Sequence, residues 1–501
     1  MSYSIWRKKP TYLFEQDIQK SELKRVLGKW SLTAIGIGAI IGGGIFVLTG
    51  TAAHYHAGPA LALSFVVAGI GCIFAALCYA EFAAMLPVEG SAYAYAYGTI
   101  GELFAWAIGW GLILEYAMGA MTVAVSWSGY FNKLMHLFGI DIPFWLRNDP
   151  VSAAKFAVDN GLDRPSFAVN LPAFIIVWLV TYILVKGIKE AASANNVIVV
   201  IKVVAVIFVI IAGAFFIKTQ NWIPFIPEAR MIPGEMLDAN NKPILVEAYG
   251  FQGVISGASA IFFAYIGFDA VSTQAGEAIN PRKDMPFAII TSLLVCTVLY
   301  ILVSLVLTGM IDYNAIVGDA LKAPVAYAFE SVGQNWAVFI VTAAATTGLI
   351  SVMLVMMLGQ TRVFLGMAKD GLLPKFFREI HPTFKTPWKS TVLVGLAVSL
   401  VAAFTPIGIL GDMTSFGTLF AFAMVCLAVL LLRIREPERE RPFKAPILFV
   451  IAPLGIIVNT ILIVSLSDLA KYCAMGWLAL GMVVYFAYGR PNSNLNKLEK
   501  Q

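Results

Sequence analysis

The chain has 501 residues, of which 59% are hydrophobic and only 13% are charged, and its mean hydropathy is +0.79. A soluble protein is close to half apolar and one quarter charged, so this composition excludes a soluble globular fold and indicates a polytopic protein of the lipid bilayer. The net charge of +5 fits an uneven distribution of charge across a membrane and does not indicate a nucleic-acid partner.

Twelve apolar stretches are long enough to cross a bilayer, which takes about 20 helical residues. An even number of spans places both termini on one side. Of the 35 Lys and Arg residues, 25 fall on that side and 9 on the other, which predicts cytoplasmic termini. The spans are expected at 31–55, 59–87, 101–131, 169–186, 194–217, 250–276, 286–311, 335–361, 390–408, 413–432, 446–467 and 472–489.

The first span, SLTAIGIGAIIGGGIFVLTGTAAHY, contains three consecutive glycines, Gly42–Gly44. Glycine is a poor helix former, and the backbone groups freed by a break can face a protein-lined cavity but not lipid. We therefore expect a break near mid-membrane, with N–H groups at Gly43 and Gly44 available to a carboxylate and carbonyls near Ile40 available to a cation. The alternative is that the glycines only allow a neighbouring helix to pack closely.

Glu115 and Lys202 are charged residues that lie well inside their spans. Glu115 lies in the middle of the third span, where it faces a cationic substrate group, serves as a proton site or bonds to a neighbouring helix. Lys202 lies about nine residues into the fifth span, on the order of 13 Å deep. A lysine at that depth must be neutral or paired, which suits a proton carrier, whereas the alternative is a side chain that extends to an interface.

The sixth span contains a second irregular stretch, from Phe262 to Phe268. Interrupted helices at corresponding positions of two halves indicate the substrate site of a transporter. With five spans per half, the halves have inverted topology. Carbonyls at Phe262 and Phe263 then face the same centre as the first break, and donors for a carboxylate beside acceptors for an ammonium suit an α-amino acid. Asp269 is expected to cap the second half of this helix.

The remaining candidates are weaker. Met353 and Met356 in the eighth span are expected to pack, and one of them to limit the side-chain pocket. Glu81, at the inner end of the second span, is expected to pair with a residue such as Arg362. No HExxH, GxSxG or GKS/T motif occurs, and the five cysteines lack metal-ligand spacing, so the sequence predicts neither an enzyme nor a metal or cofactor site.

Four segments carry a resemblance to a known family: GIGAIIGGGIF (36–46), YAEFAAMLPVEGSAYAYAY (79–97), FFAYIGFDAVSTQAGEAINPRKDMP (262–286) and TRVFLGMAKDGLLP (361–374). They are similar to the amino acid–polyamine–organocation (APC) superfamily, most closely to its bacterial cationic amino acid transporter branch, over about 23–446. The resemblance implies an all-α fold with a five-plus-five inverted repeat, discontinuous helices one and six, and two further C-terminal helices. The implied division is a cytoplasmic segment at 1–30, repeats at 31–217 and 250–432, helices at 446–489 and a cytoplasmic tail at 490–501.

The resemblance also implies roles for individual residues. Gly42, Gly43 and Gly44 would hold the substrate carboxylate, and the carbonyls of the two breaks would hold its ammonium group. Phe263 would gate the site, and Lys202 would couple transport to protons, which are the only coupling ion expected. The positions expected to bind substrate are Ile40, Ile41, Gly42, Gly43, Gly44, Glu115, Phe263, Ala264, Ile266 and Met353.

The sequence thus predicts a cytoplasmic-membrane symporter that imports L-amino acids with protons. The expected cargo is cationic (arginine, lysine, ornithine), small and neutral (alanine), or both. Three alternatives stay open: an exchanger or facilitator of the same fold, a sodium symporter, and a non-transporting amino-acid sensor. An accessory subunit is neither indicated nor excluded by the sequence.

Overall fold

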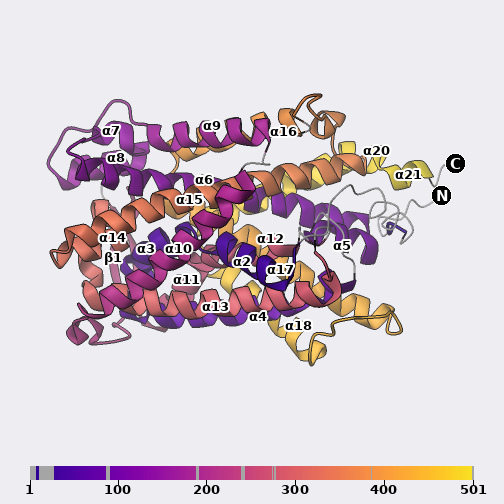
Figure 1. Cartoon of the computed structure of the whole chain (residues 1–501), viewed down its shortest axis with the longest axis horizontal. Coiled ribbons are helices and arrows are strands. Elements are labelled where there is room, and N and C mark those ends of the chain that lie inside the picture. Colours follow the sequence, from indigo (N-terminus) through magenta and orange to yellow (C-terminus); the bar gives the residue numbers. More distant parts are fainter. Residues whose placement is uncertain are drawn as a thin grey trace.

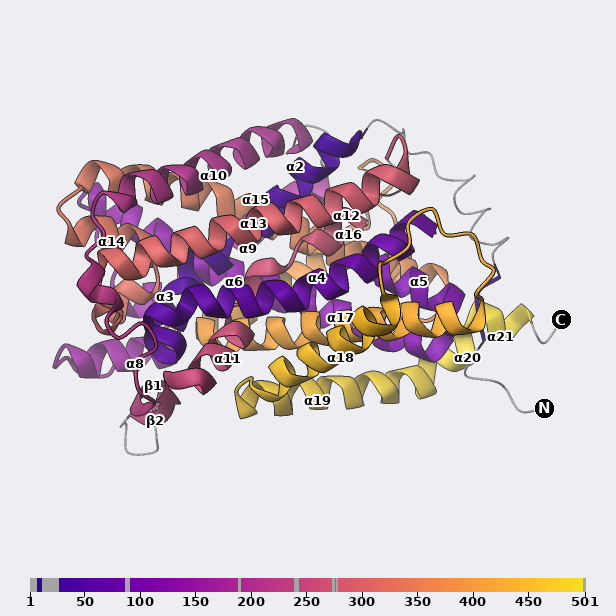
Figure 2. The ribbon, with the colours of Figure 1, turned by 90° about the horizontal axis from the view of Figure 1, so that it is seen from below.

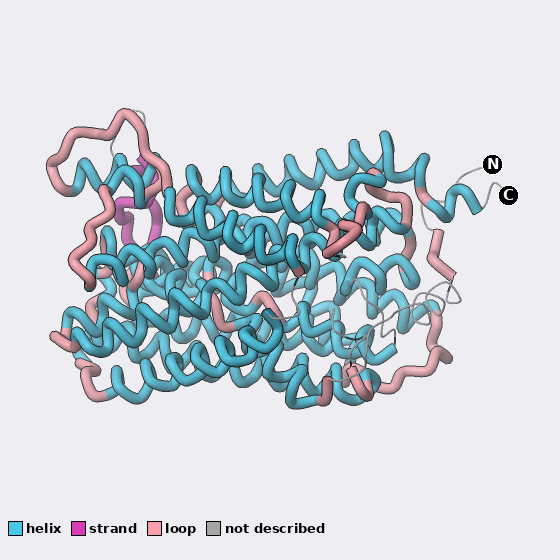
Figure 3. Tube along the Cα trace, turned by 45° about the horizontal axis from the view of Figure 1, so that its top comes forward, coloured by secondary structure: helices cyan, strands magenta, loops and turns pink. Residues whose placement is uncertain are grey.

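The computed structural model describes residues 7–10, 27–85, 91–187, 191–237, 243–272, 275, 278–384 and 386–498. Much of the expected N-terminal segment at 1–30 lies outside these ranges. The described chain is a bundle of long helices with one two-stranded hairpin, β1 Arg230–Leu237 and β2 Pro243–Ala248, at one end (Figure 3). Within the described residues, seven helices are long and apolar enough to cross a membrane, and three more are apolar but shorter, which confirms a polytopic all-α membrane protein.

The expected spans correspond to helices of the described structure. Ten spans are continuous helices, and the first and sixth are interrupted, as predicted. The continuous helices are α4 Leu61–Met85, α6 Glu102–Leu137, α9 Leu171–Lys186, α10 Ala191–Ala214, α13 Pro281–Met310, α15 Asn335–Lys369, α16 Trp388–Phe404, α17 Ile407–Arg435, α18 Leu448–Val464 and α19 Asp468–Val484. The division into inverted repeats stays a prediction.

The two ends of the bundle differ in structure (Figures 1 and 2). We call one the hairpin end, because β1 and β2 lie there together with α7 Phe144–Arg147, α8 Pro150–Asp159 and α14 Pro324–Ser331. The other is the tail end, with α5 Ser91–Thr99, α20 Arg490–Asn492 and α21 Asn494–Leu498. The described residues between the expected spans at 132–168 and 218–249 thus carry local structure at the hairpin end.

The residues near both termini meet at the tail end, around Glu102 at the start of α6. Its carboxylate pairs with Arg7 at 3.3 Å and accepts hydrogen bonds from the hydroxyls of Tyr485, at 3.1 Å, and Ser493. Arg7 also donates to Asn496 Oδ1 at 3.1 Å. The two ends of the chain therefore lie on the same side of the bundle, as the even number of spans predicts.

Hydropathy alone misjudged the ends of some elements. The stretch 88–100 was expected to be a loop, but α5 occupies Ser91–Thr99, where alanines alternate with tyrosines and favour a helix too short to span a bilayer. Helices α6 and α15 run to Leu137 and Lys369, beyond the expected ends at 131 and 361. These last turns contain polar residues that a hydropathy criterion excludes although the helix continues past the apolar core.

The expected partner of Glu81 was wrong. Its carboxylate pairs with Arg433 at 2.5 Å and with Arg441 at 3.3 Å, and it accepts from the backbone N–H of Ala445 at 2.8 Å. The reason is the packing order: α4 contacts α17, which carries Arg433, and α18, and the segment that joins these two helices carries Arg441 and Ala445, whereas Arg362 lies on α15.

Candidate functional site

The first interrupted helix breaks at the predicted glycines. Its first half, α2 Lys29–Ile40, ends before Ile41, whose backbone is extended (φ −68°, ψ 103°). Helical structure resumes in a π-helical turn, Gly44–Leu48, and continues through α3 Thr49–Ala52 and a second π-helical turn, Ala53–Ala57. The N–H groups of Gly42, Gly43 and Gly44 have no hydrogen-bond acceptor among the described residues. The break therefore leaves three neighbouring donors free.

The second interrupted helix breaks after Ala260. Its first half, α11 Gly250–Ala260, passes into a short 3-10 turn at Phe262–Tyr265. Ile266 is extended and Gly267 has φ +127°, a conformation that favours glycine, before α12 Phe268–Ser272 begins. The aromatic–glycine stretch is thus the interruption that the sequence predicted.

The two breaks touch each other at two glycines. A Cβ atom built on Gly44 would lie 2.3 Å from Ala264 Cα, and one built on Gly267 would lie 2.6 Å from the carbonyl carbon of Ala39. No side chain fits at those distances. The glycines therefore bring the free N–H groups of the first break and the backbone of the second break into one buried centre.

The expected carbonyl ligands have different partners in this centre. Ile40 O accepts from the hydroxyl of Tyr300 at 2.8 Å, and Phe263 O accepts from Ile266 N–H at 3.1 Å. A carbonyl oxygen has two lone pairs, so each retains capacity for one more donor. Ala264 and Ile266 are buried beside them.

Phe263 lies between the first break and α6. Its ring is 3.7 Å from the position that a Cβ would take on Gly43, and equally far from that position on Gly119 of α6. Its N–H donates to Ser415 Oγ on α17 at 3.2 Å, and the residue is 4% exposed. The aromatic ring thus closes over the glycine break in this conformation.

Helix α15 supplies the opposite wall. Val352 contacts Gly42, with its methyl carbons 3.2 and 3.3 Å from the Cβ position. Met353 and Met356 are both buried, and the sulfur of Met356 lies 3.5 Å from the Cβ position of Gly119. Of the two methionines, Met356 is therefore the one that lies beside the ring of Phe263.

Lys202 lies against the end of α2, in the middle of the bundle. Its side chain is fully buried, and its ammonium donates to the carbonyls of Gly38 and Ile41, the latter at 3.1 Å, and to Ser351 Oγ on α15 at 3.0 Å. The lysine stem crosses α15 at Gly348, where a Cβ would lie 2.4 Å from Lys202 Cγ. Because the last carbonyls of a helix are unpaired and carry its negative end, the ammonium occupies a cation position at the break.

Glu115 is buried on α6, one turn before Gly119, and neither carboxylate oxygen has a hydrogen-bond partner among the described residues. The hydroxyl of Thr418 lies beside it but donates to Thr414 O at 3.1 Å. The neighbouring acid, Asp269, is satisfied: it accepts from Gly267 N–H and from the hydroxyl of Tyr116, at 3.1 and 3.0 Å. Asp269 thus fixes the start of α12, as expected of a capping residue.

Sequence reasoning missed the residues that hold these groups in place. Tyr300, Ser351, Gly348 and Tyr116 each lie on a helix other than the one they support. The only signal in the sequence is a single small or hydroxyl-bearing residue in an apolar run, which is common in membrane helices. Three-dimensional packing was needed to find them.

The amino-acid sequence is similar to those of known membrane transporters. A family model described as amino acid permease matches residues 27–485. The branched-chain amino acid permease BcaP of Bacillus subtilis (strain 168) is 43% identical over 99% of this chain and 100% of its own length. The methylthioribose transporter of the same organism is 41% identical over 99% and 100%, and the vacuolar cationic amino acid transporter 4 of Arabidopsis thaliana is 36% identical over 83% and 64%. The names of these three relatives give three different cargoes.

Proposed function

The chain belongs to the amino acid permeases, a family of membrane transporters and not of enzymes, and from this membership and the two helix breaks we propose that it is a proton-coupled symporter that imports L-amino acids. We further propose that it works in the cell membrane with both termini in the cytoplasm, because positive loops cluster at the tail end. The observation that carries the proton coupling is the contact of Lys202 with the broken end of α2.

In the proposed site, both ends of the amino acid bind to backbone. The free N–H groups of Gly42–Gly44 receive the carboxylate at the positive end of the second half-helix. The remaining lone pairs of Ile40, Phe263, Ala264 and Ile266 receive the ammonium group. Backbone recognition of this kind selects for an α-amino acid and leaves the side chain to other residues.

In the proposed coupling, Lys202 controls the position of α2. A protonated Lys202 donates to the carbonyls of Gly38 and Ile41 and holds α2 against α15. A neutral amine donates more weakly, so loss of the proton releases the half-helix. Binding and release of a proton then favour different positions of the first helix, which is the requirement for coupled alternating access.

For the cargo, the carboxyl group of Glu115, unpartnered among the described residues, favours a cationic side chain, and the close approach of Met356 and Phe263 to Gly119 favours a small one such as alanine. A second candidate is branched-chain amino acids, favoured by the 43% identity to BcaP over the whole chain. Both candidates use the same backbone site.

Uptake into proteoliposomes tests this function. We expect labelled arginine or alanine to accumulate when the outside is more acidic than the lumen, without sodium, and to equilibrate only when the gradient is collapsed. Competition by each of the twenty amino acids then ranks cationic, small and branched-chain cargo. Equal uptake with and without the gradient would identify a facilitator or exchanger, and a requirement for sodium would contradict the role of Lys202.

A further inference from the structure

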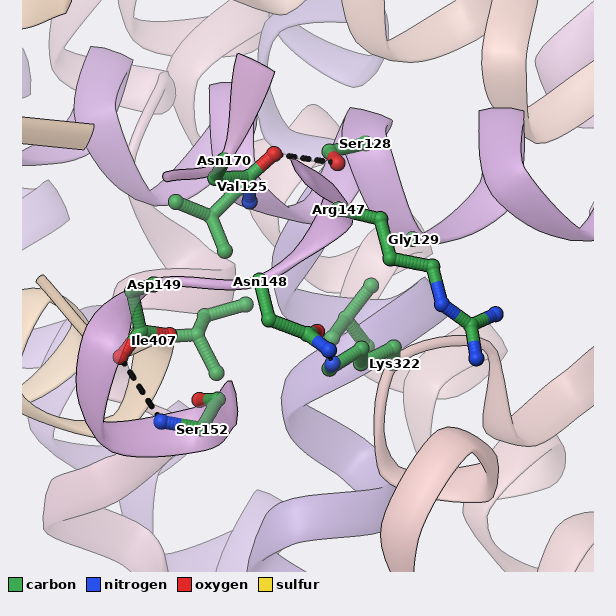
Figure 4. Close-up of a pocket in the computed structure, with 11 residues that line it drawn as sticks. Val125, Ser128, Gly129, Arg147, Asn148, Asp149, Ser152, Asn170, Lys322 and Ile407 are labelled. Atoms are coloured by element: carbon green, nitrogen blue, oxygen red, sulfur yellow. Dashed lines mark hydrogen bonds between the residues drawn. The ribbon is translucent and has the colours of Figure 1, made fainter. Parts of the chain in front are cut away.

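A second polar cavity lies at the hairpin end, away from the helix breaks. It has a volume of about 300 Å³ and lies between the last turns of α6, the start of the 144–159 region and the 317–330 segment. A smaller cavity of about 20 Å³ adjoins it and shares Gly129, Arg147 and Lys322 with it. The smaller cavity, whose lining residues are drawn in Figure 4, also reaches Val47, three residues beyond Gly44, and so extends toward the first break.

The walls of these cavities contain three buried polar atoms without a partner among the described residues: Asn132 Oδ1, Arg147 Nε and Asn148 Nδ2. The other ends of the two amides are bonded, Asn132 Nδ2 to Ser128 Oγ at 3.3 Å and Asn148 Oδ1 to the ammonium of Lys322. Their orientations are therefore fixed, and Figure 4 shows the amide of Asn148 directed at Lys322. A buried polar atom without a partner is unfavourable, so Asn132 Oδ1 and Arg147 Nε, which belong to residues lining the larger cavity, point to a ligand there, whereas Asn148 lines the smaller cavity.

The unpartnered atoms at the larger cavity are one donor, Arg147 Nε, and one acceptor, Asn132 Oδ1, which match the carboxylate and the ammonium of a zwitterion. Arg147 also pairs with Asp319 at 3.1 Å, and Lys133 with Glu330 at 2.5 Å. Both pairs are partly exposed, and exposed pairs contribute little to stability, so a charged ligand can compete with them. The volume is at the lower limit of small-molecule sites, which suits an amino acid better than a larger ligand.

We propose that this outer cavity is a second binding site for the same amino acid, occupied before the substrate moves to the helix breaks. Arg147 binds its carboxylate, and Asn132 binds its ammonium group. Gly129 sets the boundary to the smaller cavity, because a Cβ there would lie 2.7 Å from Lys322 O. This inference rests on the proposed function, since the ligand is the transported amino acid.

The test is the binding stoichiometry of labelled arginine and alanine on the full chain in lipid nanodiscs, without a pH gradient. We expect two equivalents for the wild type and one for Asn132→Leu, which is close in shape but lacks the acceptor. Arg147→Gln is the second variant and should also bind one equivalent. Asn160→Leu, on an exposed asparagine at the end of α8, is the matched control and should bind two.

A wild-type stoichiometry of one equivalent would overturn the second site, and so would two equivalents in both variants. If Asn132→Leu fails to fold, the wild type and Arg147→Gln decide the question. The two proposals can fail separately. If one equivalent binds and uptake is still driven by the pH gradient, only the outer site is contradicted. If two equivalents bind and uptake is not driven by the gradient, only the proton coupling is contradicted.

Discussion

Two of the buried charged residues in the bundle, Lys202 and Glu115, have opposite surroundings. Both are fully buried. The ammonium of Lys202 has three oxygen partners from two other helices, whereas the carboxyl group of Glu115 has none among the described residues. Because a buried charge needs a partner, the lysine is satisfied by the protein itself, and the glutamate requires a partner that comes from outside, either a proton or a cationic group.

The difference follows from the helices that these residues face. Lys202 faces the end of α2, where the break frees carbonyl oxygens that a continuous helix would use internally. Glu115 faces α17 at Gly417, where a Cβ would lie 3.1 Å from Glu115 Cα, and α17 is continuous there. A broken helix thus supplies ligands to a buried charge, and an unbroken helix supplies only close packing.

The largest expected effect is that of Lys202→Ala. This change leaves the carbonyls of Gly38 and Ile41 without their charged donor, and we expect a loss of about 3 kcal/mol of stability. Gradient-driven accumulation should fall to the level reached without a gradient. Thermal unfolding in lipid nanodiscs and proteoliposome uptake measure the two effects.

The matched control for this variant is Lys218→Ala, because Lys218 is exposed just beyond α10 and should change neither quantity. Accumulation by Lys202→Ala that still follows the pH gradient would remove the lysine from the coupling mechanism. It would also end the contrast between a satisfied and an unsatisfied buried charge.

A smaller effect is expected from Gly348→Ala, which acts on the lysine indirectly. The added methyl group would lie 2.4 Å from Lys202 Cγ and 2.6 Å from Cδ, so the stem must move and its bond to Ile41 O weakens. Overpacking of this kind costs about 1–3 kcal/mol. Gly366→Ala on the same helix meets no atom within 4 Å and should gain up to about 1 kcal/mol, because alanine favours a helix.

If thermal unfolding shows that Gly348→Ala lowers stability and Gly366→Ala raises it, the absence of a side chain at Gly348 positions the lysine. If both variants are stabilised equally, the side chain of Lys202 tolerates a methyl group at position 348, and Gly348 does not position it. The pH dependence of uptake should shift for Gly348→Ala only.

The sequence predicted the interrupted helices well because both carry strong local signals. Three consecutive glycines and an aromatic–glycine stretch in long apolar runs disfavour a continuous helix whatever surrounds them, and the breaks lie where expected, at Ile40–Gly44 and near Phe263. The depth of Lys202 also followed from its place in a span. These features depend only on residues that are neighbours in the sequence and on the thickness of a bilayer.

The contacts between helices were not predictable in the same way. The partner of Glu81 was assigned to the wrong helix, and the bond from Tyr300 to Ile40 O was not foreseen. Such contacts depend on which helices are neighbours and on how each is rotated. In a chain that is apolar almost throughout, hydrophobic periodicity carries little information on rotation, because lipid-facing and protein-facing sides have similar polarity.

The smallest expected change in stability, and the sharpest test of the contrast, is Glu115→Gln. Glutamine keeps the shape and removes the charge, and no hydrogen bond to the described residues is lost, so stability should change by less than about 1 kcal/mol. If the missing partner is a cationic substrate group, the affinity for arginine should fall about tenfold relative to alanine, as expected for one charge-assisted hydrogen bond. Competition of unlabelled arginine and alanine against one labelled substrate measures this ratio. An unchanged ratio with weaker gradient-driven accumulation would instead assign the partner as a proton, and Glu115 would then act with Lys202 in coupling.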